Sequence, residues 1–234
     1  EHVVSRFGPS LLTAQATVAL SLAQQAALNA IQEQWREQDI VLLHGVTASG
    51  KTEVYIQLIQ AALKQGGQVL YLLPEIALTT QMGKRLQRVF GDQVSVYHSK
   101  YSNNERVEVW NSVLQGDCTF VLGTRSATFL PFQQLRLVIV DEEHETSYKQ
   151  FDSTPRYHAR DAAIILAQHH KAKVLLGSAT PAIETYYNAV QGKYGLVTLQ
   201  ERFGQAALPE IVLANVRIAR ARKTLHEDFT ATLL

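Results

Sequence analysis

Short apolar runs alternate along this chain with longer amphipathic stretches. The runs over Ile40–Leu43, Gln68–Leu73 and Leu135–Val140 have the length of buried strands. Between such runs, stretches like Leu20–Glu37 and Asn103–Leu114 repeat apolar residues at the spacing of an α-helix. Strands that alternate with helices in this way predict βαβ units, and hence a mostly parallel sheet with helices on both faces.

The same pattern places the remaining elements and the edge where a ligand would bind. Further strands are expected over 94–97, 119–122, 173–176, 196–199 and 211–213, and further helices over 53–63, 78–90, 159–169 and 182–190. Ser102 and Asn103 are candidate caps for the helix that follows them. In such sheets ligands bind beyond the carboxyl ends of the strands, so polar residues that directly follow strands are expected to share one edge.

Composition describes a globular protein without an overall charge that would attract a polyanion. Of the 234 residues 46% are apolar and 18% charged, and the net charge is +1, so contact with nucleic acid would have to come from a local patch. The single cysteine, Cys118, excludes an intrachain disulfide and is expected in a buried strand. No signal peptide or membrane-length apolar run is present, and we expect a cytoplasmic protein.

The strongest motif follows the first strand directly and has the pattern G-x-x-x-x-G-K-[ST] of a phosphate-binding loop. Strand, glycine loop and helix in succession point backbone N–H groups into one concavity that favours an anion. In such a loop Lys51 would contact the β- and γ-phosphates, and the hydroxyl of Thr52 would contact Mg²⁺. The expected ATP-binding residues of the loop are Gly45, Val46, Thr47, Ala48, Ser49, Gly50, Lys51 and Thr52.

A second motif follows the strand that ends near Val140. Asp141 is placed to hold Mg²⁺, and Glu142 to orient or deprotonate an attacking water. Two adjacent carboxylates repel each other without a cation, which favours a metal ion between the phosphates and the protein. A third stretch, Gly177–Pro181, places small hydroxyl residues after another strand; alone it would be only a turn.

In this order the three motifs resemble the first RecA-like lobe of a superfamily 2 helicase motor, an α/β P-loop NTPase fold. Over roughly residues 20–205 the finer resemblance is to the PriA family of bacterial replication-restart helicases (primosomal protein N′). It is carried by the motifs above, by the acid motif's extension to His144, and by segments that begin at Pro74, His98, Glu105, Gly123, Ser147 and Arg156. The resemblance implies a linker from an upstream domain over 1–19, the ATP-binding lobe over 20–205, and a linker with the truncated start of a second lobe over 206–234. The chain's first residue, Glu1, and its helix-like last residues agree with a piece of a longer protein.

Roles at the nucleotide follow from the resemblance. Gln24 takes the position of a glutamine that reads adenine, with a solvated helix glutamine as the alternative. Lys51, Asp141 and Glu142 are the expected catalytic residues, and Thr52 and Asp141 would hold Mg²⁺ through ATP. The expected residues for coupling the ATP state to the grip on DNA are His144, Ser178, Ala179 and Thr180.

Two further groups of residues are expected to bind DNA. Thr79, Thr80, Thr124 and Arg125 match segments that touch the sugar-phosphate backbone, although Arg125 has an ion pair within the lobe as its alternative. An aromatic-rich loop follows the acid motif, and its rings would stack on unpaired bases or, alternatively, pack on the lobe. Its expected DNA-binding residues are Tyr148, Lys149, Phe151, Arg156 and Tyr157.

The chain departs from its relatives at two positions. Pro155 stands where many relatives carry tryptophan, which leaves Phe151 as the nearest substitute for that ring. Ala48 stands where they commonly have glycine, and this adds a Cβ at the crown of the phosphate loop.

The resemblance implies ATP and Mg²⁺ as cofactors, no zinc in this fragment, and 3′ to 5′ movement on DNA. The implied partners are single-stranded or forked DNA, single-strand binding protein and primosome proteins, without a membrane, and we expect a monomer. No arginine-finger motif follows residue 205, so the fragment alone is expected to hydrolyse ATP poorly. The alternatives are another superfamily 2 translocase or repair helicase, a small-molecule kinase, and a non-catalytic DNA- or protein-binding fragment.

Overall fold

A computed structural model describes residues 19–152 and 154–202, together with 217, 220, 225–226 and 229–230. The chain divides into two compact units, Glu1–Phe203 and Gly204–Leu234. In the second unit, β8 (Leu225–His226) pairs antiparallel with β9 (Phe229–Thr230). The strand predicted over 211–213 lies outside the described residues. The first unit holds all three motifs.

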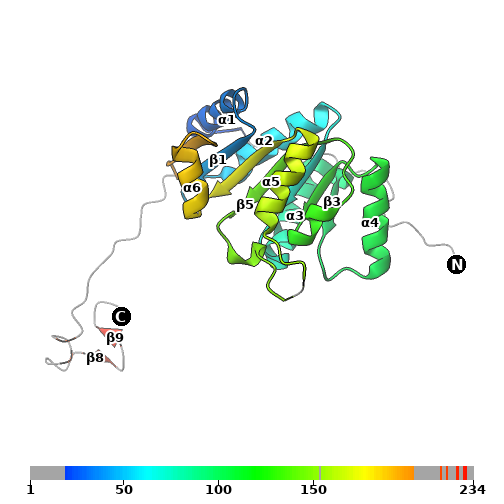
Figure 1. Cartoon of the computed structure of the whole chain (residues 1–234). Coiled ribbons are helices and arrows are strands. Elements are labelled where there is room, and N and C mark those ends of the chain that lie inside the picture. Colours follow the sequence, from blue (N-terminus) through cyan, green and yellow to red (C-terminus); the bar gives the residue numbers. More distant parts are fainter. Residues whose placement is uncertain are drawn as a thin grey trace. The chain divides into compact units, whose positions relative to one another are not determined.

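The first unit contains a seven-stranded parallel sheet, as predicted. Its strands in chain order are β1 (Ile40–Gly45), β2 (Gln68–Leu72), β3 (Val94–Tyr97), β4 (Phe120–Gly123), β5 (Leu135–Asp141), β6 (Lys173–Ser178) and β7 (Gly195–Leu199). In space they lie in the order β3-β4-β2-β5-β6-β1-β7, and every neighbouring pair is parallel. Figure 1 shows this sheet between two layers of helices.

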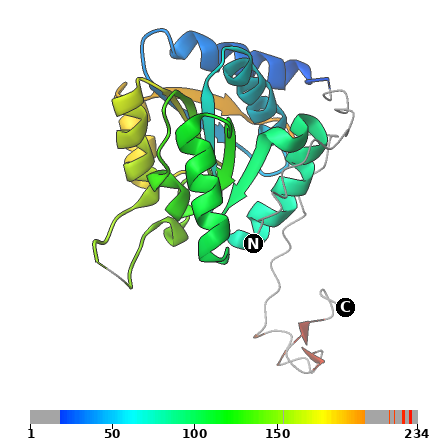
Figure 2. The ribbon, with the colours of Figure 1, turned by 90° about the vertical axis from the view of Figure 1, so that its right-hand side faces the viewer.

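Six α-helices cover the sheet on both faces, and Figure 2 shows the same layers from the side. They are α1 (Leu22–Gln34), α2 (Lys51–Lys64), α3 (Ile76–Phe90), α4 (Asn103–Gln115), α5 (Ala159–His170) and α6 (Ile183–Val190). Short 3₁₀ turns lie at η1 (Gly91–Gln93), η2 (Arg125–Phe129) and η3 (Thr146–Tyr148). Helices α1, α2 and α3 pack on one face, and α4, α5 and α6 on the other.

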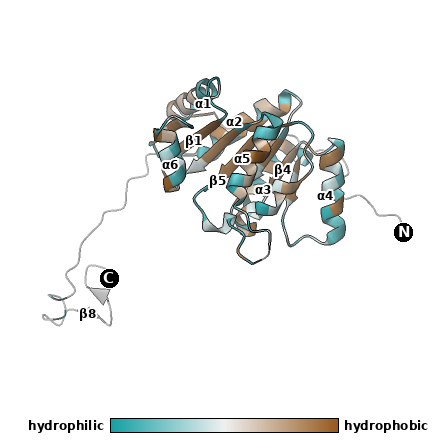
Figure 3. Ribbon diagram, in the orientation of Figure 1, coloured by the Kyte–Doolittle hydropathy of each residue, from teal (hydrophilic) through white to brown (hydrophobic). Residues whose placement is uncertain are grey.

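Alternate side chains of each strand supply these two cores. In β1, Val41 and Leu43 belong to the core under α1–α3, whereas Ile40 and Leu42 belong to the core under α4–α6. Because both faces are covered, most strand positions are apolar instead of alternating with polar residues, and the strands are largely brown in Figure 3. Arg136 in β5 and Thr198 in β7 are exposed exceptions. The sequence therefore shows nearly continuous apolar runs at the strands, because helices cover both faces of the sheet.

The ends of the elements follow local chemistry. Helix α1 begins at Leu22 because the Ser21 hydroxyl accepts from the Gln24 N–H and the Gln24 side chain accepts from the Ser21 N–H. Ser102 caps α4 in the same way, so Asn103 is the first helical residue and not a cap. Cys118 is buried as predicted, but it precedes β4 and is not part of the strand.

Sheet order brings the ends of three motif-bearing strands together. Strand β6 lies between β5 and β1, with Asp141 level with Gly177 and His44 level with Ser178. The phosphate loop after β1, the acid motif after β5 and the hydroxyl segment after β6 therefore share one edge, as the strand positions predicted. None of the helices in the described part of the chain is long and apolar enough to span a membrane.

Candidate active site

The phosphate loop runs from β1 into α2 and closes around its own lysine. Gly50 caps α2 with a left-handed backbone, φ +78°, which glycine adopts at little cost. Lys51 Nζ donates to the Gly45 carbonyl oxygen over 2.9 Å. A Cβ at Gly45 would lie 2.9 Å from Lys51 Cγ, so the missing side chain makes room for the lysine. The buried Ser49 hydroxyl has no hydrogen-bond partner among the described residues.

Gln24 lies against this loop and is almost fully buried, with 1% of its surface exposed. Its Nε2 donates to the Ser49 carbonyl oxygen over 3.1 Å, while its Oε1 accepts from the Ser21 N–H over 2.9 Å. A Cβ at Gly50 would come within 2.2 Å of Gln24 Nε2, so these two positions are fitted to each other. The alternative of a solvated helix glutamine is wrong, and adenine reading stays a prediction.

Ala48 carries a strained backbone at the crown of the loop, with φ +64°. A left-handed backbone costs a residue with a Cβ about 1–2 kcal/mol, which exceeds the roughly 0.5–1 kcal/mol of extra entropy that glycine loses on folding. We therefore expect Ala48→Gly to raise the free energy of unfolding by up to about 1 kcal/mol, measured by urea denaturation. Ala61→Gly, in the last turn of α2, is the control and should lower it by up to about 1 kcal/mol. A lowered stability in Ala48→Gly would contradict strain at this position.

Two acidic residues end β5. The Asp141 side chain is buried, and its Oδ1 accepts from the Glu142 N–H over 3.1 Å. Glu142 is partly exposed and has a left-handed backbone, φ +46°, which turns the chain sharply out of the strand. Burial raises the pKa of both carboxyl groups, and the neighbouring Asp141 charge raises the pKa of Glu142 further while Lys51 acts in the opposite direction. A raised pKa makes Glu142 a better proton acceptor once it is ionised.

Three buried tyrosines surround Asp141; the roles of Tyr55 and Tyr71 were missed in the sequence, and Tyr148 was expected to bind DNA instead. The Tyr55 hydroxyl donates to Asp141 Oδ1 and the Tyr71 hydroxyl to Asp141 Oδ2, both over 3.0 Å. The Tyr148 hydroxyl bonds the backbone carbonyls of Leu72 and Asp141, over 3.1 Å and 2.7 Å. The sequence does contain a signal for such contacts: a tyrosine within an apolar strand, or at a core-facing position of a helix, indicates a buried hydroxyl that needs a hydrogen-bond partner.

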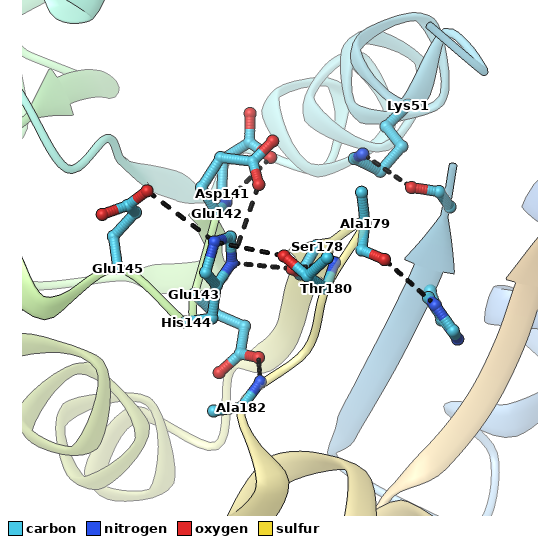
Figure 4. Close-up of polar contacts among 12 residues, drawn as sticks. Lys51, Asp141, Glu142, Glu143, His144, Glu145, Ser178, Ala179, Thr180 and Ala182 are labelled. Carbon is cyan, nitrogen blue, oxygen red and sulfur yellow. Dashed lines mark hydrogen bonds and ion pairs between the residues drawn. The ribbon is translucent and has the colours of Figure 1, made fainter. Parts of the chain in front are cut away.

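His144 joins the acid motif to the hydroxyl segment after β6. Its Nδ1 lies 2.8 Å from Ser178 Oγ, and its Nε2 lies 3.3 Å from Thr180 Oγ1. Glu142 Oε2 and Glu145 Oε1 each lie 3.7 Å from this ring, one near each nitrogen. Figure 4 shows the ring between the carboxylates and the hydroxyls. His144 therefore contacts two of the expected coupling residues, Ser178 and Thr180, whereas the Ala179 carbonyl oxygen lies 3.2 Å from His44 Nε2.

Glu143 faces away from this site and was also missed. It is fully buried and accepts from Arg160 Nη1 over 2.9 Å, from Thr185 Oγ1 over 2.8 Å and from the Ala182 N–H over 2.7 Å. These partners come from α5, from α6 and from the residue that precedes α6. The acid motif is thus fastened to both helices on that face of the sheet.

A cleft of about 760 Å³ opens beside the two carboxylates. Asp141 and Glu142 line it together with Lys84, Arg85 and Arg88 of α3. Arg85 also pairs with Glu53 on α2. The same cleft therefore contains both cationic side chains and the two acids, and Arg85 links it to the start of α2.

Two residues expected to bind DNA are fully buried, and those expectations are corrected. The Tyr148 side chain is fully buried and bonded to backbone, so its ring cannot stack on a base. Thr79 is also fully buried, with its hydroxyl on the Glu75 carbonyl oxygen one turn earlier in α3. Thr80 is exposed but makes the same kind of bond, to the Ile76 carbonyl oxygen. In each case the sequence gives the residue type but does not determine whether the side chain faces the core or the solvent.

The remaining residues of that expectation lie at the same end of the sheet. Thr124 follows β4 and is 7% exposed. Arg125 Nη1 donates to the carbonyl oxygens of Ser147 and Lys149, over 3.1 Å and 3.0 Å. Arg125 thus anchors the start of the aromatic-rich loop through backbone carbonyls instead of the ion pair considered as its alternative.

The aromatic-rich loop leaves the lobe and returns as a narrow hairpin. Lys149 and His158 form an antiparallel bridge, and the Gln150 N–H donates to the Tyr157 carbonyl oxygen over 2.9 Å. Phe151 is 55% exposed, with Lys149 Nζ 5.2 Å from its ring centre, whereas Tyr157 packs edge-on against Phe129. Arg156 is exposed. Phe151 is thus the exposed ring of the loop among its described residues.

The chain is similar to known helicases in both sequence and fold. The DEAD/DEAH box helicase family matches residues 21–189, and the chain belongs to that family. The solved structure of RecG bound to a three-way DNA junction has the same fold, with a TM-score of 0.59 and 22% identity over 80% of this chain and 24% of that one. The seven-stranded sheet and the motif edge are therefore those of a superfamily 2 helicase motor lobe.

Within that class the chain is a homologue of replication restart protein PriA. It is 45% identical to PriA of Bacillus subtilis over 196 residues, which are 83% of this chain and 24% of the relative. It is 48% identical to PriA of Haemophilus influenzae over 168 residues, 72% of this chain and 23% of the relative. The chain thus spans about a quarter of the length of these relatives.

Proposed function

We propose that this chain is the ATP-binding first motor lobe of a 3′ to 5′ DNA helicase that acts in replication restart. The observation that carries the proposal is the contact of His144 with Ser178 and Thr180 beside the carboxylate of Glu142 and the phosphate loop. This arrangement gives the ATP site a direct mechanical connection to the neighbouring strand. A simple nucleotide-binding protein does not need that connection.

The residues of the edge suit a nucleotide with Mg²⁺. The buried Ser49 hydroxyl, for which the described residues offer no partner, lies in the phosphate loop, where a phosphate oxygen would accept from it. Lys51 would move from the Gly45 carbonyl to the β- and γ-phosphates. Thr52 and Asp141 offer the hard oxygen ligands that Mg²⁺ prefers, and the bound ion would neutralise charge on the phosphates. Gln24 would read adenine from its place against the loop.

Hydrolysis and coupling are assigned to the acid motif. Glu142 orients the attacking water and accepts its proton, helped by the raised pKa that burial gives it. His144 then reports the state of the nucleotide to Ser178, Ala179 and Thr180. A second lobe would add the arginine that phosphoryl transfer needs, which in general is worth about 10³–10⁵-fold in rate. The chain alone is therefore proposed to be a poor ATPase.

The DNA-facing part is assigned to the aromatic-rich loop and its neighbours. Phe151 is the proposed stacking ring, with Lys149 and Arg156 attracting phosphates. Thr80, Thr124 and Arg125 are the proposed backbone contacts. Single-stranded or forked DNA is the proposed ligand, and single-strand binding protein and primosome proteins are the proposed partners of the full protein.

The alternatives fit less well. Another superfamily 2 translocase would share the fold, but the identity of 45% to a PriA protein far exceeds the 22% to RecG. A small-molecule kinase has no use for a histidine that bridges the acid motif to a segment on another strand. A non-catalytic binding fragment would leave the bonded carboxylates and the lysine loop without a role.

The test compares ATPase rates of this chain and of a version extended through the second lobe, each with and without single-stranded DNA. We expect DNA-stimulated turnover only in the extended protein, because its site is complete and its DNA contacts reach both lobes. Rapid turnover by the chain alone, insensitive to DNA, would instead identify a self-contained P-loop enzyme. The absence of turnover in both, with DNA still bound, would favour the non-catalytic alternative.

A further inference from the structure

We propose that Tyr55 and Tyr71 are positioning residues for the metal-binding carboxylate of Asp141. Their hydroxyl groups fix its orientation and leave it one free acceptor position for the magnesium–nucleotide complex. The proposal rests on the proposed function, since it assigns these two residues to the same ATP site. It adds to the acid motif two side chains that come from other elements of the fold.

The two tyrosines come from different elements and bond the two oxygens of the same carboxylate. Tyr55 comes from the second turn of α2, directly behind the phosphate loop, and Tyr71 comes from β2, which neighbours β5. Both side chains are fully buried, and their rings pack edge-to-face at 5.7 Å. Each donates to a different oxygen of Asp141 over 3.0 Å. The carboxylate therefore cannot rotate about its Cβ–Cγ bond without losing both hydrogen bonds.

Most acceptor positions of the Asp141 carboxylate are already occupied by protein donors. An ionised carboxylate offers about four acceptor positions, two on each oxygen. Oδ1 accepts from the Tyr55 hydroxyl and from the Glu142 N–H, and Oδ2 accepts from the Tyr71 hydroxyl. Among the described residues no other donor reaches this carboxylate, so one position is left, on Oδ2. The tyrosines thus compensate the burial of the charge and limit Asp141 to a single contact with whatever binds it.

The space for the Tyr55 hydroxyl comes from the neighbouring motif. A Cβ at Gly177 would lie 1.9 Å from the Tyr55 hydroxyl oxygen and 3.3 Å from Asp141 Oδ1. Gly177 precedes Ser178 in β6 and lies level with Asp141. A phenylalanine at position 55 would fill the apolar core equally well. The additional hydroxyl of tyrosine fits only because Gly177 has no side chain. The three motifs therefore meet at this hydrogen bond.

The experiment measures how Mg²⁺ changes the binding of a fluorescent ATP analogue to the 234-residue chain. The variants are Tyr55→Phe and Tyr71→Phe, with Asp141→Asn as the reference for a lost carboxylate. We expect binding without Mg²⁺ to stay within about twofold of the unchanged chain, and the Mg²⁺ concentration for half-maximal binding to rise about 10-fold or more, as for other partners that orient a metal ligand. Tyr97→Phe is the matched control: it removes the hydroxyl of a buried tyrosine on β3, whose partner at 3.4 Å is Arg106.

The outcomes separate this proposal from the proposed function. If the unchanged chain binds the analogue without any effect of Mg²⁺, the proposed ATP site fails. If Asp141→Asn loses the Mg²⁺ effect while both tyrosine variants retain it at the level of Tyr97→Phe, the ATP site stands and the positioning role is overturned. Urea denaturation of each variant establishes that it is folded under the assay conditions, and each single tyrosine variant tests the role by itself.

Discussion

Glu142→Gln is expected to lower DNA-stimulated ATP turnover by about 10²–10⁴-fold in the protein extended through the second lobe, the usual contribution of a positioned general base. Glutamine keeps the size of the side chain but cannot accept the proton of the attacking water. Since the phosphate loop, Asp141 and Gln24 are unchanged, affinity for ATP with Mg²⁺ should stay within a few-fold. Steady-state turnover and equilibrium binding of a fluorescent ATP analogue measure the two effects separately.

Glu145→Gln provides the matched control for this prediction. Glu145 and Glu142 each place a carboxylate oxygen 3.7 Å from His144, on opposite sides of the ring. Only Glu142 directly follows Asp141 and shares the cleft with it. Glu145→Gln should therefore keep most of the turnover. An equal loss in both variants would mean that charge near His144, and not a base at position 142, is what hydrolysis requires.

Glu143→Ala is expected to destabilise the lobe by about 3–5 kcal/mol, the cost of breaking a buried ion pair by removing one partner. The reason is that Arg160, whose side chain is only 12% exposed, would keep its charge without Glu143, and Thr185 and the Ala182 N–H would lose their acceptor. Urea denaturation of the chain gives the free energy of unfolding directly. Glu143→Gln, which keeps the acceptor oxygen, should lose clearly less.

The control for this loss is another glutamate that pairs with an arginine, Glu33 with Arg36 on and after α1. Its side chain is 66% exposed, so solvent screens the pair and Glu33→Ala should change stability by less than about 1 kcal/mol. Similar losses in Glu33→Ala and Glu143→Ala would show that burial does not decide the strength of these pairs. A small loss in both would contradict the role of Glu143 as the fastening between the acid motif, α5 and α6.

The fold could be predicted because its signals are local. Each buried strand is a short, mostly apolar run, and two of the helices, α1 and α4, begin at a capping serine, Ser21 and Ser102. The shared edge of the three motifs also follows from the sequence, since each motif directly follows a parallel strand. The order of the strands does not, because it depends on which apolar faces pack together and not on any single run.

The same limit explains the residues that were missed or misplaced. The contacts of Tyr55 and Tyr71 with Asp141 join α2, β2 and β5, so they depend on strand order. Tyr148 was assigned to DNA by its residue type, whereas the 3₁₀ turn at Thr146–Tyr148 directs its ring into the core. Glu143 lies between two residues of the ATP site in sequence, but the left-handed backbone of Glu142 changes the direction of the chain so that Glu143 faces α5 and α6.

The missing side chain at Gly177 has a consequence for how this protein can change over time. Because a methyl group there would overlap the hydroxyl of Tyr55, alanine at position 177 becomes possible only after position 55 has accepted a smaller residue. A substitution at position 55, in turn, gives up one of the three hydrogen bonds that the Asp141 carboxylate accepts from described residues. Two positions 122 apart in the sequence are therefore expected to be inherited as a pair, and a variant library that changes them one at a time would find alanine at position 177 intolerable while Tyr55 is present.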